Sequence, residues 1–356
     1  MITEALSANE ARALQGLVRH PGLSDREVAG LIGMGTSSLV TARLRLERGG
    51  YLRNIAVPAV QRLGAEFLSV SYTRFDSLPL REAVVDCLAD VVSETEVFSL
   101  FLETSQCMFM QFARSYTEAR QNIEAIETVY REQGSLLRGF TTAIFPFGMS
   151  RLVNYFDYSH LFDSPDAEKG SGEAWGVEPL FDGGGPADLT AMGRKVMLGI
   201  LEHPAMSDTK LAGAIGASRM TVGKWRKALL SEGLVSARRE PALAMLGMEL
   251  LVLTLGRFAK GLSKGLRHFM PELIGTMGPV LFAVLGTDDI LVLSTFSSFT
   301  RYREANNMFM SKIKEHEIFA SPPERVMFSL RAMRTIKAQE YGPLVRRLLA
   351  QRGWQP

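Results

Sequence analysis

The chain repeats itself at a separation of 183 residues. Between Leu6 and Phe75 about a third of the positions are identical to their partners between Leu189 and Phe258, without a gap, whereas unrelated sequences of ordinary composition would agree at about one position in sixteen. Among the matching pairs are His20 and His203, Pro21 and Pro204, Asp25 and Asp208, Gly33 and Gly216, Gly64 and Gly247, and Arg74 and Arg257. Since a duplication determines which folds can be considered, each copy is interpreted together with the other.

Composition restricts the class of protein. A chain of 356 residues with 46% hydrophobic and 22% charged residues suits two to four soluble domains. No apolar run is long enough to span a bilayer and the first residues lack a signal-peptide layout, so we predict a cytoplasmic protein without a membrane partner. The two cysteines, Cys87 and Cys107, have no metal-ligand spacing around them, and we predict no disulfide, metal or cofactor.

Positive charge is concentrated in the segment that begins each copy. The net charge of the whole chain is +2. Residues 189–241 hold nine basic and four acidic residues, and residues 1–58 hold seven and five, so the rest of the chain is acidic. Such clustering favours a polyanionic partner for these two segments.

Each of these segments has the pattern of three helices and a strand. Ser7 with Glu10 and Ser24 with Glu27 form capping-box patterns, and a third helix is predicted over residues 36–48. Gly33 provides a turn before it, and a strand ends at Pro58. We therefore predict a winged helix-turn-helix at residues 1–58 and a second one at residues 189–241.

The remainder of each copy alternates strands and helices in the order βαββαβ. Period-two and short apolar runs predict four strands and two helices in residues 63–162, and the same again in residues 246–346. That order is typical of a ferredoxin-like domain. Residues 163–188 are rich in Gly, Asp and Pro and predict a flexible linker. The predicted fold class is α+β, with two tandem copies of a winged helix-turn-helix followed by a ferredoxin-like domain.

The third helix of the second winged unit has an exposed basic face. On a helical wheel this face lies opposite the apolar positions and suits a helix that enters the DNA major groove. Two arginines follow it where a wing would contact the backbone of DNA. The candidate DNA-binding residues of this copy are Arg219, Met220, Thr221, Lys224, Arg226, Lys227, Arg238 and Arg239. The alternative is a solvated basic face on an interaction domain.

The corresponding face of the first copy is less basic. Its candidate DNA-binding residues are Ser37, Thr41, Arg45 and Arg48. An outward Leu44 is unusual for a helix that contacts bases, so this copy is interpreted either as a weaker binder or as a degenerate copy used for packing. The sequence leaves open whether it still binds DNA.

Two other features have a plain interpretation beside a functional one. The Gly286-Thr287-Asp288-Asp289 segment lies between two predicted strands. Gly286, Asp288 and Asp289 are candidates for effector binding, because the carboxylates suit an ammonium group, and the alternative is an ordinary turn. The paired His20 and His203 lack further ligands and are interpreted as loop or capping residues.

The architecture resembles that of the Lrp/AsnC (feast/famine) transcription regulators. The resemblance is carried by residues 23–64, by the Leu63-Gly64 and Leu246-Gly247 pairs, and by the Gly286 turn, which is similar to a turn near that family's effector site. Members of that family are single-copy chains that dimerise through the sheet domain, so two copies in one chain imply an internal pseudo-dimer. A related group with this architecture comprises decarboxylases acting on sirohaem, which rely on His and Arg residues around a tetrapyrrole pocket, and no His cluster is found here.

The leading hypothesis is a sequence-specific DNA-binding transcription regulator that is not an enzyme. Double-stranded DNA is its expected partner, a small-molecule effector is left open, and so is a homo-oligomer formed through the ferredoxin-like domains. The alternatives are a sirohaem-decarboxylase-like tetrapyrrole enzyme and a protein-interaction module built on winged helices. The operator sequence, the effector and the direction of regulation do not follow from the sequence.

Overall fold

The described part of the chain forms two compact units. The computed structural model describes residues 6–74, 82–133, 139–162, 178–181, 183–260 and 264–350. Unit 1 comprises residues 1–55, 150–179 and 237–331, and unit 2 comprises residues 56–149, 180–236 and 332–356. Helices and antiparallel sheets occur in both, so the predicted α+β class is confirmed. Among the described helices, none has the length and apolar character needed to cross a membrane.

Three helices begin the described part of unit 1. They are α1 (Ala8–Arg19), α2 (Asp25–Leu31) and α3 (Thr36–Arg48). Both predicted capping boxes are present, because the Ser7 and Ser24 hydroxyls accept from the third backbone N–H of their helices. Gly33 adopts a φ of 62° between α2 and α3, a conformation that glycine adopts without steric cost. Local sequence signals therefore suffice to define these helices.

Unit 2 has the same three helices from the second repeat. They are α7 (Ala191–Glu202), α8 (Asp208–Ile215) and α9 (Arg219–Ser231). One ion pair recurs in both sets. Arg43 Nε lies 3.1 Å from Asp25 Oδ2 in unit 1, and Arg226 Nε lies 2.6 Å from Asp208 Oδ1 in unit 2. The duplicated arginine thus joins the second and third helices of each set.

A short two-stranded sheet follows these helices in the chain. It pairs β1 (Leu52–Pro58) with β7 (Val235–Pro241). Each strand is followed by one helical turn, α4 (Val60–Leu63) and η3 (Leu243–Leu246) respectively, and each turn ends at a glycine of positive φ.

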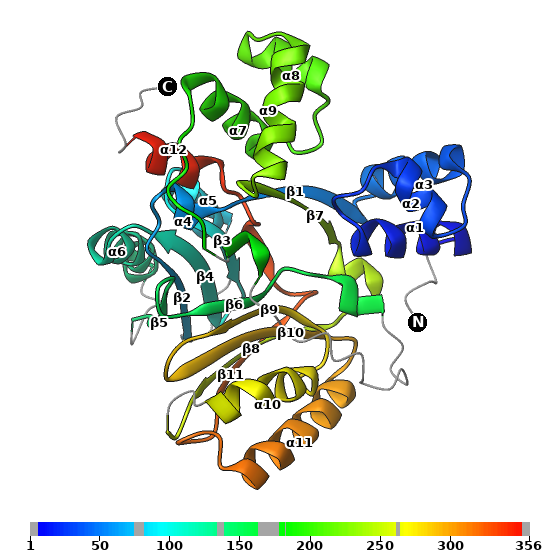
Figure 1. The fold of residues 1–356 in the computed structure, drawn as a ribbon. Helices are drawn as coiled ribbons and strands as arrows, with labels where there is room; N and C mark the ends of the chain where they lie inside the picture. Colours follow the sequence, from blue (N-terminus) through cyan, green and yellow to red (C-terminus); the bar gives the residue numbers. More distant parts are fainter. Residues whose placement is uncertain are drawn as a thin grey trace. The chain divides into compact units, whose positions relative to one another are not determined.

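The sheet of unit 1 has the strand order β11-β8-β10-β9-β6 and is antiparallel throughout. Its strands are β8 (Leu250–Arg257), β9 (Val280–Leu285), β10 (Asp289–Phe296), β11 (Glu324–Ser329) and β6 (Arg151–Tyr155). Helices α10 (Lys264–Gly275) and α11 (Phe299–His316) cover one face (Figure 1). The core between them and the sheet includes Leu273, Ala283, Val292 and Phe309.

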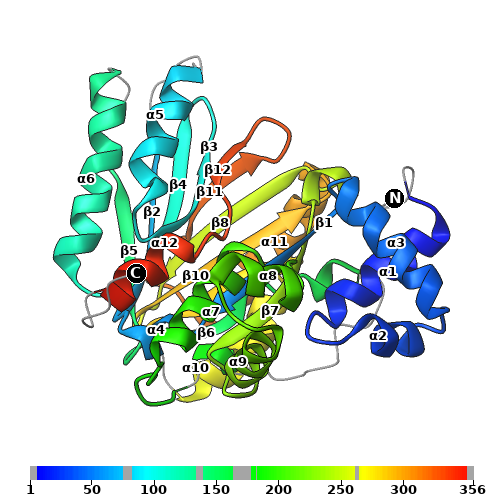
Figure 2. The ribbon, with the colours of Figure 1, turned by 90° about the horizontal axis from the view of Figure 1, so that it is seen from above.

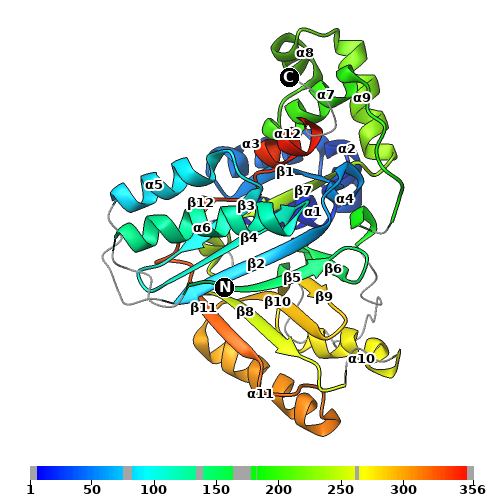
Figure 3. The same cartoon turned by 90° about the vertical axis from the view of Figure 1, so that its left-hand side faces the viewer.

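The sheet of unit 2 has the same design, with the strand order β12-β3-β4-β2-β5. Its strands are β2 (Phe67–Arg74), β3 (Val97–Leu102), β4 (Gln106–Ala113), β5 (Thr141–Pro146) and β12 (Arg334–Lys337). Helices α5 (Glu82–Ser93) and α6 (Tyr116–Glu132) lie along one face of it (Figures 2 and 3). Here the core includes Leu88, Leu100, Phe109 and Ile126.

The repeat extends through the sheets at a constant separation. β2 and β8, β4 and β10, α6 and α11, and β5 and β11 each begin 183 residues apart. The four strands predicted in each copy are present, with ends that differ by a residue or so from those expected. Sequence and structure therefore agree on which residues of the two copies correspond.

Each sheet contains a fifth strand that the sequence did not predict. β6 belongs to the first repeat but pairs with β9 of the second, and β12 belongs to the second but pairs with β3 of the first. Both are short edge strands without the long apolar runs of the central strands, which explains why they were missed. Each repeat ends with a short helix, which is the 3-10 helix η1 (Ser159–Phe162) in the first copy and the α-helix α12 (Gly342–Ala350) in the second.

The predicted linker falls mostly outside the described residues. Residues 163–177 and residue 182 are not described. The short 3-10 helix η2 (Pro179–Phe181) lies in the rest of it. Further along, Ala187 N donates to the carbonyl of Arg62.

Candidate functional site

The predicted basic face of α9 contains both exposed and half-buried residues. Arg219, Met220, Lys224 and Lys227 are exposed, with Met220 at 86%. Thr221 is half-buried, and its backbone N–H and hydroxyl group are within hydrogen-bonding distance of the Ser218 hydroxyl group. The sequence therefore located an exposed cationic surface on this helix.

The other three predicted arginines of the second copy are engaged inside the protein. Arg226 pairs with Asp208 and donates from Nη2 to the carbonyl of Met206, at 3.0 Å. Since Arg43 makes the same pair in the first repeat, this side chain has a structural role that the duplication reproduces.

The two arginines of β7 contact other parts of unit 1. Arg238 Nη2 lies 2.5 Å from Glu178 Oε1. Arg239 donates to the carbonyl groups of Leu17 and Leu23, and burial lowers its pKa. Both side chains are half-buried, so neither stands out as a cationic wing.

The candidate residues of the first copy are exposed on α3. Ser37, Thr41, Arg45 and Arg48 all lie on the surface of this helix, beside the exposed Leu44. The Thr41 hydroxyl donates to the carbonyl of Ser37, and Arg45 is 3.9 Å from Glu10. This face is therefore mixed in character, as its sequence suggests.

The Gly286 turn is a tight connection between β9 and β10. Gly286 N donates to the carbonyl of Asp289, and a β-carbon on Gly286 would lie 2.0 Å from Asp289 Oδ1, so a larger residue would fit only if the Asp289 side chain moved. Burial raises the pKa of Asp289, an effect that Arg257 opposes and Asp288 reinforces. Gly286 and Asp289 are close together while Asp288 is exposed, and the geometry explains the glycine by the turn alone.

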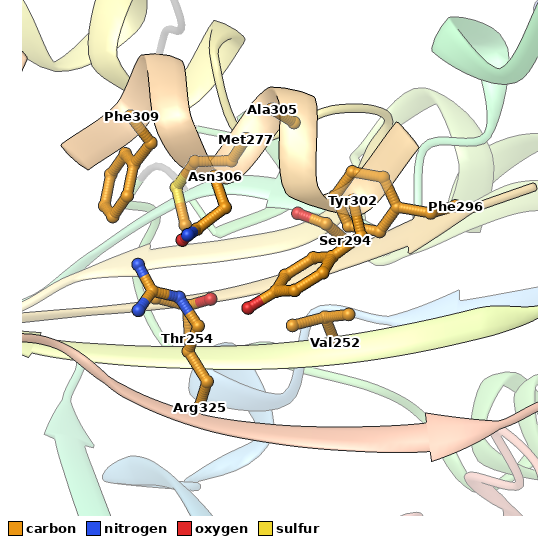
Figure 4. A pocket seen from close by; sticks show the side chains of 10 residues that line it. All are labelled: Val252, Thr254, Met277, Ser294, Phe296, Tyr302, Ala305, Asn306, Phe309 and Arg325. Carbon is orange, nitrogen blue, oxygen red and sulfur yellow. The ribbon is translucent and has the colours of Figure 1, made fainter. Parts of the chain in front are cut away.

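A polar pocket in unit 1 was not predicted from the sequence. It lies between α11 and the sheet, has a volume of about 20 Å³, and is drawn in Figure 4. The ten described residues that line it include no acid. They are Val252, Thr254, Met277, Ser294, Phe296, Tyr302, Ala305, Asn306, Phe309 and Arg325.

Arg325 brings positive charge to this pocket. It lies on β11, opposite Thr254 of β8, and Figure 4 shows its guanidinium group directed to the same space as the Tyr302 hydroxyl and the Asn306 amide. The guanidinium lies 5.6 Å from the centre of the Phe309 ring, and Nη2 is 3.3 Å from Met310 Sδ. Burial lowers the pKa of Arg325 and the neighbouring Tyr302 opposes this, but an arginine stays charged throughout the physiological range.

The sequence held one signal for this pocket. Arg325 lies on the same face of β11 as Met327, whereas the buried Val326 and Phe328 lie on the other face of this strand. The corresponding residue of the first repeat, 183 positions earlier, is Thr142. The sequence alone therefore shows that the second repeat has a charged residue, Arg325, where the first repeat has the uncharged Thr142.

The described residues that line the pocket include no histidine. Among the described residues there is no group of three or more His, Cys, Asp or Glu side chains that would hold a metal ion. His20 and His203 cap the ends of α1 and α7, where each backbone N–H donates to a glycine carbonyl. That agrees with their interpretation as capping residues.

The comparisons with known proteins give likeness in fold. No protein-family model matches the chain, and no curated protein matches it. The crystal structure of the siroheme decarboxylase NirDL is similar over 97% of this chain and 100% of that chain, with a TM-score of 0.50 and 10% identity. The AsnC family transcriptional regulator from Agrobacterium tumefaciens covers 39% of this chain and 89% of its own, with a TM-score of 0.30 and 13% identity. E. coli AsnC covers 40% of this chain and 93% of its own, with a TM-score of 0.30 and 17% identity.

These findings correct the leading hypothesis from the sequence. The prediction of a DNA-binding transcription regulator that is not an enzyme is wrong, because a solved structure that is similar to the chain from end to end is that of a siroheme decarboxylase. The error has a physical cause. The three-helix pattern and its surface charge are local features, and they do not distinguish a helix that binds DNA from the same helix retained in another protein.

Proposed function

We propose that the chain is an enzyme that acts on a carboxylated tetrapyrrole and removes a carboxyl group from a side chain of the macrocycle. The observation that carries the proposal is the likeness in fold to a siroheme decarboxylase over 97% of the chain. The pocket of unit 1 supports it, because Arg325 brings a positive charge to it and the described residues that line it include no acid.

The reaction makes defined demands on a protein. The carbon–carbon bond to the carboxylate breaks, carbon dioxide leaves, and the carbon that keeps the electron pair takes up a proton. Holding the carboxylate in one orientation requires fixed donors, and a cation with hydroxyl groups provides them. Arg325, Ser294 and Tyr302 provide such a set here. With a volume of about 20 Å³ the pocket accepts a carboxyl group, while the macrocycle itself stays outside it.

Turnover of siroheme by the purified full chain tests this proposal. We expect the visible absorption spectrum of the tetrapyrrole to change on binding, and mass spectrometry to detect the product that has lost carbon dioxide. The variant Arg325→Met should lower kcat/KM by about a hundredfold, the loss typical of removing one essential charged or hydrogen-bonding group. The matched control is Arg301→Gln, which removes an exposed arginine of α11.

Two results contradict the proposal. One is the absence of any spectral change and any decarboxylated product with the wild-type chain. The other is full turnover by Arg325→Met, which would place the reaction elsewhere in the protein.

The finer organisation remains part of this proposal. We propose that each repeat combines a winged helix-turn-helix, at residues 1–58 and 189–241, with a ferredoxin-like domain, at residues 63–162 and 246–346. A linker over residues 163–188, a cytoplasmic location and assembly through the sheet domains stay predictions, as does effector binding at the Gly286 turn.

A further inference from the structure

Two buried polar atoms of the pocket have no hydrogen-bond partner among the described residues. They are Ser294 Oγ on β10 and Asn306 Oδ1 on α11. Ser294 is only 3% exposed. Because a buried polar atom without a partner is destabilising, the presence of two such atoms in the lining of one pocket indicates that the pocket receives a polar group from outside the chain.

The other polar groups of the pocket are all able to donate a hydrogen bond. Figure 4 shows the hydroxyl groups of Tyr302 and Thr254 and the guanidinium of Arg325 around the same space. Hydroxyl groups can donate or accept, guanidinium only donates, and an amide can turn its nitrogen to the ligand. Since none of the described lining residues is acidic, this set suits an anion and repels a cation.

The size of the pocket restricts the anion. A volume of about 20 Å³ is slightly more than one water molecule requires, which is about 10–15 Å³ on the same scale. A planar carboxylate matches such a space, and its two oxygens match the fork of an arginine. A tetrahedral phosphate has more oxygens and needs more room. Apolar side chains, including Val252 and Phe296, complete the wall.

The equivalent place in unit 2 lacks these features. Thr142 replaces Arg325, and its hydroxyl lies 2.9 Å from the Ser71 hydroxyl. Gln111 replaces Ser294 and donates to the carbonyl of Ala119, the residue that replaces Tyr302. The same fold therefore closes this place with its own side chains, and the donor set of unit 1 is not a by-product of the architecture.

We infer that the pocket lined by Arg325, Ser294, Tyr302 and Asn306 is a binding site for a single carboxylate group. This inference deepens the proposed function, since it names the group of the substrate that the site receives. It rests on that function only for the identity of the rest of the ligand. Small monocarboxylates should occupy the site by themselves.

Titration of the full chain with ¹³C-labelled acetate and propionate tests the inference. We expect the carboxylate resonance to broaden with wild-type protein, and an equal concentration of inorganic phosphate at constant ionic strength to leave that broadening unchanged. Arg325→Gln should weaken binding about tenfold or more, the effect of losing a charge-assisted hydrogen bond. Tyr302→Phe should weaken it about threefold, while Arg301→Gln should bind like the wild type.

Three outcomes overturn the inference. The first is the absence of broadening with the wild type, which would mean that the pocket holds only water. The second is equal broadening with an Arg325→Gln variant that circular dichroism shows to be folded. The third is displacement of labelled acetate by phosphate as effectively as by propionate. The proposed function fails separately. Acetate binding that depends on Arg325, in a chain that does not act on siroheme, would support the carboxylate site and contradict the tetrapyrrole reaction.

Discussion

The helix-covered faces of the two sheets show how copies of one fold diverge. In unit 1 this face leaves a pocket with an arginine and two polar atoms that have no hydrogen-bond partner among the described residues. In unit 2 the same place holds a network of polar side chains that bond to one another. Asn122 Nδ2 donates to Gln111 Oε1 at 2.7 Å and to Glu96 Oε2 at 2.8 Å.

An arginine closes this network in unit 2. Arg347 on α12 approaches Glu96 with Nε 3.1 Å from Oε1, and Glu96 is 2% exposed. A buried carboxylate is stable only with partners of this kind. The comparison shows that a duplicated fold tolerates either arrangement at one place, polar groups satisfied within the chain or polar groups left for a ligand.

The largest change in stability should follow from breaking the network of unit 2. Arg347→Met leaves Glu96 buried with the Asn122 amide as its remaining hydrogen-bond partner among the described residues. Breaking a fully buried pair costs about 3–5 kcal/mol, and because Arg347 is itself 42% exposed, we expect a loss of about 2 kcal/mol in the free energy of unfolding. Urea denaturation measures it.

The neighbouring arginine provides the control. Arg346 pairs with Glu94, which is 75% exposed, and with Glu202. Arg346→Met should cost less than about 1 kcal/mol, as surface pairs do. Equal losses in the free energy of unfolding of the two variants would mean that the burial of Glu96 does not increase the contribution of its ion pair to stability.

A smaller effect should distinguish the fifth strands of the two sheets. Lys337 on β12 is 3% exposed, and its Nζ donates to the carbonyl of Val92, whereas the corresponding Asn154 on β6 donates to the carbonyl of Val280. Burial lowers the pKa of Lys337 to about 8 from 10.5. Between these values the unfolded chain binds more protons than the folded chain, so stability should rise with pH.

The variant Lys337→Asn gives β12 the residue that β6 has at the corresponding position, and it should remove the dependence of stability on pH. We expect the wild type to gain about 1 kcal/mol between pH 7 and 9, and the variant to stay level over that range. Measurements end at pH 9, because burial raises the pKa of Cys107 to about 12 from 9.0 and stability falls at higher pH. Lys227→Asn, at an exposed lysine, is the control, and a slope retained in Lys337→Asn would refute the assignment.

The fold was predictable from the sequence wherever local signals and the duplication agreed. The capping residues Ser7 and Ser24, the turn at Gly33 and the alternating apolar runs located the helices and central strands. β6 and β12 were missed because edge strands carry a weak pattern. Their pairing with strands of the other repeat depends on contacts between residues far apart in the chain, which periodicity does not encode.

The candidate site was less predictable than the fold. Basic residues near α9 were interpreted by type, but the partners of Arg226, Arg238 and Arg239 lie far from them in sequence, at Asp208, Glu178 and the α1–α2 region. Whether a charge is paired inside the protein depends on such contacts. The pocket of unit 1 combines residues of three strands and α11, and only the exchange of Thr142 for Arg325 between the copies pointed to it.

The smallest change in stability should come with a loss of binding. Ser294→Gln gives unit 1 the residue that fills unit 2, and because the longer side chain enters an existing cavity, we expect a loss of about 1 kcal/mol in the free energy of unfolding, the lower end of the cost of adding volume to a packed core. Acetate binding should nevertheless disappear, since the longer side chain occupies the space beside Arg325. The reciprocal variant, Gln111→Ser, removes bonds to Ala119 and Asn122 but supplies no positive charge, so no acetate should bind in unit 2. The same ¹³C titration measures both variants. If Ser294→Gln still bound acetate, then filling of this space by a longer side chain would not be the reason why unit 2 lacks the site.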